Sequence, residues 1–346
     1  MKVDYLVVGA GLAGMAFAEI LASKNKTFLV FNNHSQNASV VAGGMYNPVI
    51  LKRFTPVWDA ENQLQTALPF YNSLEEKFNT KFDFKTKIAR VFKTTEEQNN
   101  WFAASDKPLL KKYLKANIST KPITGLNSPF GYGIVNSTGR INTKMLLTVY
   151  ENYLIEKRIL IEEEFKHSKI IHSEEKLIYD QIEAKHIVFC EGYGIKNNPF
   201  FNHLPLNGTK GELLTINAPE LKLDKIAKGP VFIMPIKEHV YKVGATFNWT
   251  DKTLNPTEKG KEELLTKLKQ LINVPFEIID HQAGIRPTVK DRRPLLGTHA
   301  KHKNLAILNG LGTRGVMLAP KMAMQLYNFL EEGISLDNEV NINRFY

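Results

Sequence analysis

The stretch DYLVVGAGLAGMAFAEIL, Asp4–Leu21, carries the signals of a buried strand, a glycine turn and a helix in immediate succession. Tyr5–Val8 is a continuous apolar run, typical of a parallel strand covered on both faces. Gly9, Gly11 and Gly14 follow with the G-x-G-x-x-G spacing. In a dinucleotide-binding unit the first glycine allows a tight turn, the second lets a pyrophosphate approach the backbone, and the third lets helix and strand pack closely.

A glycine turn between a strand and a helix also occurs for purely structural reasons, so the context matters. A second strand is predicted at Thr27–Phe31, and such a strand usually ends in a carboxylate that binds the ribose hydroxyls. Here the residue is Asn32, whose amide can still hydrogen-bond a hydroxyl group. We therefore favour a dinucleotide site over a structural turn, although the usual acidic residue is missing.

The chain has 346 residues, of which 43% are apolar, and this predicts a globular protein of two domains with a large core. No apolar run is long enough to span a membrane. The first strand is predicted directly after Met1 and Lys2, so we expect a cytoplasmic protein without a signal peptide. The single cysteine, Cys190, excludes an intramolecular disulfide bond. No histidine spacing resembles a metal site, and we predict none.

The formal net charge of +10 would suit binding to an anion such as tRNA, and would equally suit a lysine-rich proteome. The densest basic stretches are Lys107–Lys121 and Lys290–Lys303. Both also have the composition of solvated faces and loops. We favour this second explanation and keep nucleic acid as the alternative.

After the second strand comes Ser39–Pro48, a segment of small residues. Its Ala42, Gly43 and Gly44 permit close approach of the backbone to another group. A structural loop can have this composition, but the position directly after a nucleotide unit favours a segment that runs along a flat ligand.

Between about Phe82 and Val135 the chain changes character and is predicted to form a separate inserted domain. Short strands are expected at Ile88–Phe92 and Gly131–Val135, around a lysine-rich segment that we expect to be helical. Gly139–Asn142 then reads as a turn that starts a helix.

The pattern predicts antiparallel strands again from Lys210, interrupted by one amphipathic helix that contains Leu264 and Leu268. The expected fold is therefore α/β in the first domain and α+β overall. We predict a Rossmann-like nucleotide-binding domain from 1–80, 138–205 and 284–346, with an antiparallel-sheet substrate domain from 81–137 and 206–283.

Near the C-terminus a predicted strand leads into NGLGTRGVMLAP and a final helix that Gly333 ends. Gly310, Gly312 and Gly315 repeat the G-x-G-x-x-G spacing. Too little chain follows Gly315 for a second βαβ unit. The free N–H groups at this helix N-terminus are therefore expected to face another electron-rich group.

Taken together, these motifs make the chain resemble the D-amino-acid oxidase superfamily of FAD enzymes, especially its glycine oxidase and sarcosine oxidase branch. Six motifs occur in the family's order: VVGAGLAG (Val7–Gly14), AGGM (Ala42–Met45), Glu191-Gly192, KGE (Lys210–Glu212), GIRPTVKDRRPLLG (Gly284–Gly297) and GxxxRGVMLAP (Gly310–Pro320). This ordered set is far more specific than the first glycine motif alone.

The resemblance implies non-covalent FAD, with its pyrophosphate at the first glycine turn, its ribose near Asn32, and the Ser39–Met45 segment beside the flavin. The C-terminal loop would present N–H groups to the flavin N1 and C2 carbonyl, where negative charge collects on reduction. The implied cofactor-binding residues are Gly9, Ala10, Gly11, Leu12, Ala13, Gly14, Asn32, Ser39, Ala42, Gly44, Met45, Gly192, Gly312, Thr313, Arg314, Gly315 and Val316.

The implied reaction is oxidation of a C–N bond in an amino acid or N-substituted glycine, with hydride transfer to flavin N5, imine hydrolysis by water and O2 as electron acceptor. Arg286 matches the family arginine that holds the substrate carboxylate, which suits its planar fork; a structural arginine between domains is the alternative. With Thr313 and Arg314 it forms the set of candidate catalytic residues.

The chain also departs from the glycine oxidase pattern. Phe232 replaces a tyrosine, and Thr313 replaces a second arginine, so glycine itself is a doubtful substrate. The GLGTRG loop is more similar to the flavin domain of a bifunctional tRNA wobble-uridine-modifying enzyme. A tRNA-modifying flavoenzyme and a non-catalytic flavin-binding protein are therefore the two alternatives to an amine oxidase or dehydrogenase.

Overall fold

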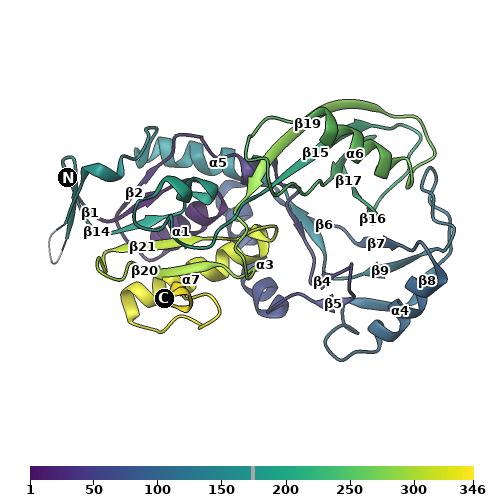
Figure 1. Ribbon diagram of the computed structural model, residues 1–346, viewed down its shortest axis with the longest axis horizontal. Coiled ribbons are helices and arrows are strands. Elements are labelled where there is room, and N and C mark those ends of the chain that lie inside the picture. The colour runs from purple at the N-terminus through teal and green to yellow at the C-terminus, as the bar shows by residue number, and fades with distance from the viewer. Residues whose placement is uncertain (173–175) are drawn as a thin grey trace.

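The computed structural model describes residues 1–172 and 176–346. Two large β-sheets lie at opposite ends of an elongated molecule (Figure 1). No helix in the described part of the chain is long and apolar enough to cross a membrane.

The first sheet is built around a parallel core, and its hydrogen-bonded order is β11-β2-β1-β14, with β21 and β13 both pairing with β14. β12, β13 and β20 are its antiparallel members. The strands are β1 (Lys2–Val8), β2 (Phe28–Phe31), β11 (Leu160–Ile161), β12 (Ile170–His172), β13 (Leu177–Tyr179), β14 (Ile182–Phe189), β20 (Leu295–Thr298) and β21 (Leu305–Asn309).

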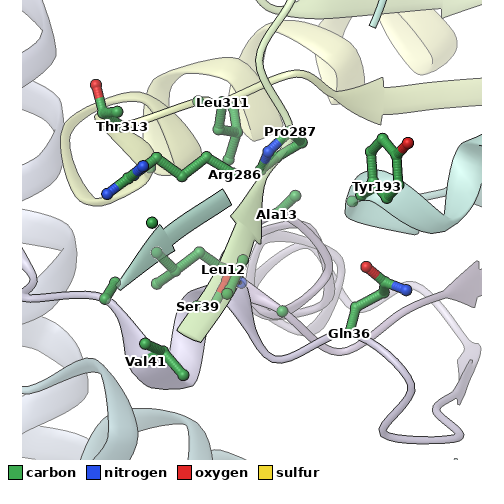
Figure 2. A pocket seen from close by; sticks show the side chains of 18 of the residues that line it. Leu12, Ala13, Gln36, Ser39, Val41, Tyr193, Arg286, Pro287, Leu311 and Thr313 are labelled. Carbon is green, nitrogen blue, oxygen red and sulfur yellow. Dashed lines mark hydrogen bonds between the residues drawn. The ribbon is translucent and has the colours of Figure 1, made fainter. Parts of the chain in front are cut away.

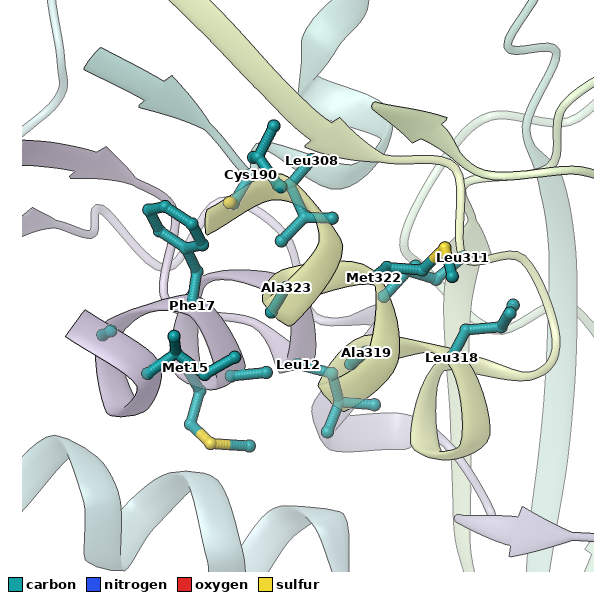
Figure 3. Close-up of a cluster of buried hydrophobic side chains, with 14 of the residues drawn as sticks. Leu12, Met15, Phe17, Cys190, Leu308, Leu311, Leu318, Ala319, Met322 and Ala323 are labelled. Carbon is teal, nitrogen blue, oxygen red and sulfur yellow. The ribbon is translucent and has the colours of Figure 1, made fainter. Parts of the chain in front are cut away.

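Apolar side chains cover both faces of this sheet, as the unbroken apolar run in β1 predicts. Tyr5 and Val7 contribute to one core and Leu6 and Val8 to the other. The first core includes α1 and α7, whose side chains interdigitate in Figure 3. The helices of this part are α1 (Leu12–Ser23), α2 (Ala38–Val41), α3 (Ala60–Phe78), α5 (Thr143–Glu156) and α7 (Gly315–Glu332). Of these, α3 packs on α7, and α2 contacts α5 and the strand β19 of the second sheet.

The second sheet has the order β19-β15-β18-β17-β16-β7-β9-β8 and is antiparallel except for the pair β7 and β16. It packs with α6 over a separate core. Its elements are β7 (Ile88–Val91), β8 (Leu114–Ser119), β9 (Tyr132–Val135), β15 (Thr209–Asn217), β16 (Ile226–Lys228), β17 (Phe232–Lys237), β18 (Val240–Gly244), β19 (Glu277–Arg286), α4 (Thr95–Ser105) and α6 (Glu258–Leu268).

Two small sheets lie between these parts. One has the order β3-β10-β6 and the other pairs β4 with β5. Their strands are β3 (Met45–Tyr46), β4 (Val49–Ile50), β5 (Thr55–Pro56), β6 (Asp83–Lys85) and β10 (Gly139–Ile141), and the 3-10 helices of the chain are η1 (His167–Lys169), η2 (Gly192–Asn197) and η3 (Ile342–Phe345).

One local prediction was wrong and one was only partly right. Between the two predicted strands the helix is α4, which contains no lysine, whereas the lysine-rich part that follows it forms turns and then the edge strand β8. A helix starts at Gly139–Asn142 as predicted, since Asn142 caps α5 through Met145 N, but the strand β10, which pairs with β3 and β6, takes the place of the expected turn. The small-residue segment contains the short helix α2. The domain limits given above stay a prediction, and β19 extends beyond residue 283 to Arg286.

Candidate functional site

A single large cavity of about 880 Å³ collects almost all of the predicted site residues. They come from the β1–α1 turn, α2, η2, the end of β19 and the loop before α7, as the labelled side chains in Figure 2 show. The lining includes Gly9, Ala10, Gly11, Leu12, Ala13, Asn32, Ser39, Ala42, Gly44, Met45, Gly192, Arg286, Gly312, Thr313, Arg314, Gly315 and Val316. Segments far apart in the sequence therefore meet around one space.

The β1–α1 turn has the geometry that its glycine spacing predicts. Gly9 has φ +101°, and a Cβ atom there would lie 2.6 Å from the carbonyl oxygen of Cys190. Gly14 does not line the cavity; a Cβ atom there would lie 1.8 Å from the carbonyl oxygen of Gly9. Its role is therefore close packing of α1 against the turn, whereas Gly9 and Gly11 keep the turn free of side chains at the cavity.

The N-terminus of α1 opens on this cavity without a side-chain cap from its own Gly11. Ser39 Oγ accepts a hydrogen bond of 3.2 Å from Leu12 N, which ties α2 to the start of α1. The N–H groups of a helix N-terminus together with its dipole favour an anionic ligand. The geometry therefore fits a pyrophosphate at this turn.

The loop before α7 supplies a second helix N-terminus to the same cavity. Arg314 is the N-cap residue and gives no side-chain cap. Gly312 has φ +56° and Gly192 has φ +57°, and a Cβ atom added at either would meet no described atom within 4 Å. Both glycines therefore present bare backbone to open space, which suits a large planar ligand close to the chain.

Asn309, which sequence reasoning missed, connects these two glycine loops. Its buried Nδ2 donates to the carbonyl oxygen of Gly192 at 2.9 Å, and its Oδ1 accepts from Gly310 N at 2.7 Å. The only sequence signal is its place at the end of a strand directly before glycine.

Arg286 enters the cavity from the end of β19 and points toward the loop that carries Thr313 (Figure 2). Nη1 donates to the carbonyl oxygen of Thr246 at 3.2 Å, and the guanidinium lies 4.5 Å from the centroid of Phe247. No ion pair to Arg286 exists among the described residues. Burial lowers its pKa to about 10, so the group is still a cation at neutral pH.

The KGE motif explains how the half-buried guanidinium of Arg286 fits against β15. A Cβ atom at Gly211 would lie 2.0 Å from Nη2 of Arg286, so only glycine leaves room for the guanidinium. On the opposite face of β15, fully buried Lys210 binds Asp251 and the Thr253 hydroxyl at 2.5 and 3.0 Å. The alternation of β15 thus makes space for Arg286 on one face and anchors the loop after β18 on the other.

Arg314 is a second cation at the cavity. Burial, and then the nearby Arg292 and Arg293, lower its pKa. Thr313 beside it is exposed at the end of the loop. The two predicted catalytic residues of this loop therefore share the cavity with Arg286.

Asn32 is the residue predicted to lie near the ribose of the cofactor. Its side-chain amide donates a hydrogen bond to Glu151 Oε1 at 3.1 Å. Its donor group is thus already engaged, and its Oδ1 accepts from His34 N at 3.3 Å. Further lining residues that carried no sequence signal are Gln36 and Tyr193, at the end of the cavity near η2 (Figure 2).

The residues present fit FAD, because two helix N-termini whose own N-cap residues supply no side-chain cap, and bare glycine backbone, surround one large cavity. The only cysteine, Cys190, is buried, and burial raises the pKa of its thiol. In the described part of the chain no cluster of histidine, cysteine and carboxylate residues could hold a metal ion.

Comparison with known proteins identifies the family. The model of the DAO family, FAD dependent oxidoreductase, matches residues 4–328. The chain is 24% identical over 344 residues to glycine oxidase of Bacillus subtilis (strain 168), which covers 92% of this chain and 91% of that protein. It is 24% identical over 312 residues to the tRNA 5-methylaminomethyl-2-thiouridine biosynthesis bifunctional protein MnmC of Legionella pneumophila, with 84% of this chain but only 45% of that protein covered.

The fold agrees with these relatives. The crystal structure of glycine oxidase from Geobacillus kaustophilus matches with a TM-score of 0.77 and 19% sequence identity, covering 97% of this chain and 96% of that one. This confirms the predicted fold class, an α/β two-domain architecture with a Rossmann-like FAD-binding part. Because the family model spans nearly the whole chain, the protein belongs to the DAO family and is an FAD-dependent oxidoreductase.

Proposed function

We propose that this enzyme oxidises the C–N bond of an amine that bears a carboxylate, either an amino acid or an N-substituted glycine. The observation that carries the proposal is Arg286, a half-buried cation at the cavity without an acidic partner among the described residues. A buried charge is costly unless it is paired. A substrate carboxylate would supply the missing partner through two parallel hydrogen bonds.

Bound FAD supplies the two-electron acceptor, and the chain supplies position and electrostatics. The α1 N-terminus would hold the pyrophosphate, and the neighbouring α7 N-terminus would stabilise negative charge on another part of the bound group. Attachment would be non-covalent, because the buried thiol of Cys190 stays protonated at neutral pH.

Near Arg286 the cavity wall is apolar rather than acidic. Phe232 packs against the backbone at Gly43, where an added Cβ atom would lie 3.3 Å from the ring. Phe247 flanks the guanidinium. Glu191, at the other end, is already bound to His167 and Asn198 at 2.9 and 2.7 Å. This arrangement supports a reaction in which the amine binds neutral and the chain orients its C–H bond toward the flavin without a general base.

The test is an anaerobic absorbance spectrum of the purified holoenzyme before and after a panel of amino acids and N-alkyl glycines is added. Bleaching of the flavin by a carboxylate-bearing amine, and not by the matching amine without a carboxylate, is expected. A flavin that no amine bleaches would instead favour the non-catalytic flavin-binding alternative. Admission of O2 or a quinone to the reduced enzyme then identifies the electron acceptor; we expect O2.

A tRNA-modifying function is the second candidate, and a basic cavity beside the main one favours it. This cavity has a volume of about 430 Å³, and Lys52, Arg53 and Lys107 line it together with Arg90, which pairs with Glu97 in the same lining; Lys52 is shared between both cavities. Such a group of cations suits nucleic-acid phosphates. Binding of tRNA that weakens steeply with salt, together with bleaching by tRNA and not by free amines, would establish this function in place of the first.

A further inference from the structure

A second cationic group lines the main cavity at a distance from Arg286. Lys228, at the end of β16, and Lys267, on α6, both belong to the lining. Lys228 Nζ lies 5.8 Å from the centroid of Phe232, the ring that packs against Gly43. The ammonium group is thus close to the segment that we assign to the flavin.

The charges around Lys228 leave its own charge unbalanced. Arg90 on β7 and Lys267 on α6 are the charged groups that act on it, and both are positive. Each of these two has its own acidic partner, because Arg90 binds Glu97 at 2.9 Å and Lys267 binds Glu263 at 2.5 Å. Among the described residues, Lys228 itself has no ion pair.

The register of the second sheet relates Lys228 to Arg286. Directly opposed residues of an antiparallel pair have their side chains on the same face of the sheet. Lys228 on β16 is opposite Phe232 on β17, which is opposite Gly244 on β18, which in turn is opposite Leu213 on β15. Arg286 is opposite Thr209 on β15, an even number of residues from Leu213. Lys228 and Arg286 therefore lie on the same face of the sheet, the face that lines the cavity.

Four strand spacings of about 4.8 Å and an offset of four residues along β15 separate the two positions, which places their backbones on the order of 20 Å apart. The long side chains of lysine and arginine shorten the gap between the charged groups. A ligand that contacts both is therefore larger than glycine and has anionic groups near its two ends.

We propose that Lys228 binds a second anionic group of the substrate, a carboxylate or a phosphate carried on an extended arm of the carboxylate-bearing amine. This inference rests on the proposed function of Arg286 as the site of the first carboxylate. A lysine ammonium is a point charge that accepts either anion without a fixed geometry. Lys228 would thus act as a specificity-determining residue, whereas Arg286 orients the reacting end.

Binding can be tested without turnover by isothermal titration calorimetry of the holoenzyme with linear α,ω-dicarboxylates of increasing length. Monocarboxylates of the same carbon number are the reference ligands, and ω-phosphonocarboxylates form the second arm. We expect at least one dianion of either class to bind roughly 10-fold or more tightly than its monoanion, the effect of one charge-assisted contact. The class with the larger advantage identifies the anion.

The variant Lys228→Met should reduce this advantage to about the level of the monoanion and leave monocarboxylate affinity unchanged. Lys225→Met is the matched control, because Lys225 pairs with Asp224 and lies outside the cavity lining; it should keep the advantage. Equal binding of mono- and dianions by the wild type, or an advantage that survives in Lys228→Met, would overturn the proposal. Monocarboxylates that bind equally well to Arg286→Met would instead refute the role of Arg286, so the two failures are distinguishable.

Discussion

Arg286 gives the strongest test of the active-site assignment. Replacement by methionine keeps an apolar stem beside Phe247 and removes the guanidinium, which has a hydrogen bond to the Thr246 carbonyl oxygen and no acidic partner among the described residues. The lowered pKa, about 10 against 12.5, corresponds to on the order of 3 kcal/mol of unfavourable burial of the charge. Arg286→Met relieves that cost, so we expect the free protein to keep its thermal stability and its FAD.

Substrate binding, in contrast, should be weakened in the Arg286→Met variant. Loss of a buried bidentate carboxylate contact costs about 3 kcal/mol, which raises the Michaelis constant roughly 10²-fold. Steady-state kinetics with the amine found in the bleaching screen measure this effect, and Arg286→Lys, which keeps the charge without the fork, should lie between the two. A variant that holds FAD normally and shows an unchanged Michaelis constant would refute the carboxylate role.

Further predictions concern pH and packing. Lys228 has a pKa lowered to about 8 by burial and by the two neighbouring cations, so the preference for a dianionic ligand should fall as the pH rises through about 8, measured by calorimetry from pH 7 to pH 9. His186 is buried with its pKa lowered to about 4; the unfolded chain therefore binds more protons between pH 4 and 6.5, which costs about 2 kcal/mol of stability at pH 5. His186→Leu should flatten this dependence of Tm on pH if the packing is kept. Gly14→Ala should lower both Tm and FAD content, because its Cβ atom would clash with Gly9 O; a stable, fully loaded variant would contradict the packing role.

The parts of the fold that the sequence predicted well are those with local signals. The apolar run of β1 and the glycine spacing after it specify strand, turn and helix within a few residues, and the start of α7 has the same character. The edge strand β8 was missed because Lys115 and the lysines just before the strand suggested a solvated helix. Charged residues on an edge strand discourage pairing with another chain, so its composition reflects its place in the sheet and not an intrinsic helix preference.

The same contrast applies to the cavity. The glycine loops and Arg286 stand in motifs that occur along the chain, and the structure brings them together around one space. Lys228 carries no such signal, and the only signal at Asn309 is its place directly before Gly310. Lys228 lies at the cavity because the strands from β16 to β15 pair in one particular register. Asn309 contributes to the site because it forms hydrogen bonds to two glycine loops. Long-range pairing of this kind cannot be read from one sequence.

The strand β15 has one face that lines the cavity and one face that holds the structure together. Its cavity face contains Gly211 and Leu213, and its outer face holds Lys210 and Glu212 in a buried polar network. The network fixes the strand, whereas Gly211 only leaves space for Arg286. A change on β16 or β17 can therefore alter what lies beyond the first carboxylate without disturbing Arg286 or the glycine turn at Gly9. Substrate identity is for this reason best sought in the residues at the Lys228 end of the sheet, where neither the glycine motifs nor the fold impose a side chain.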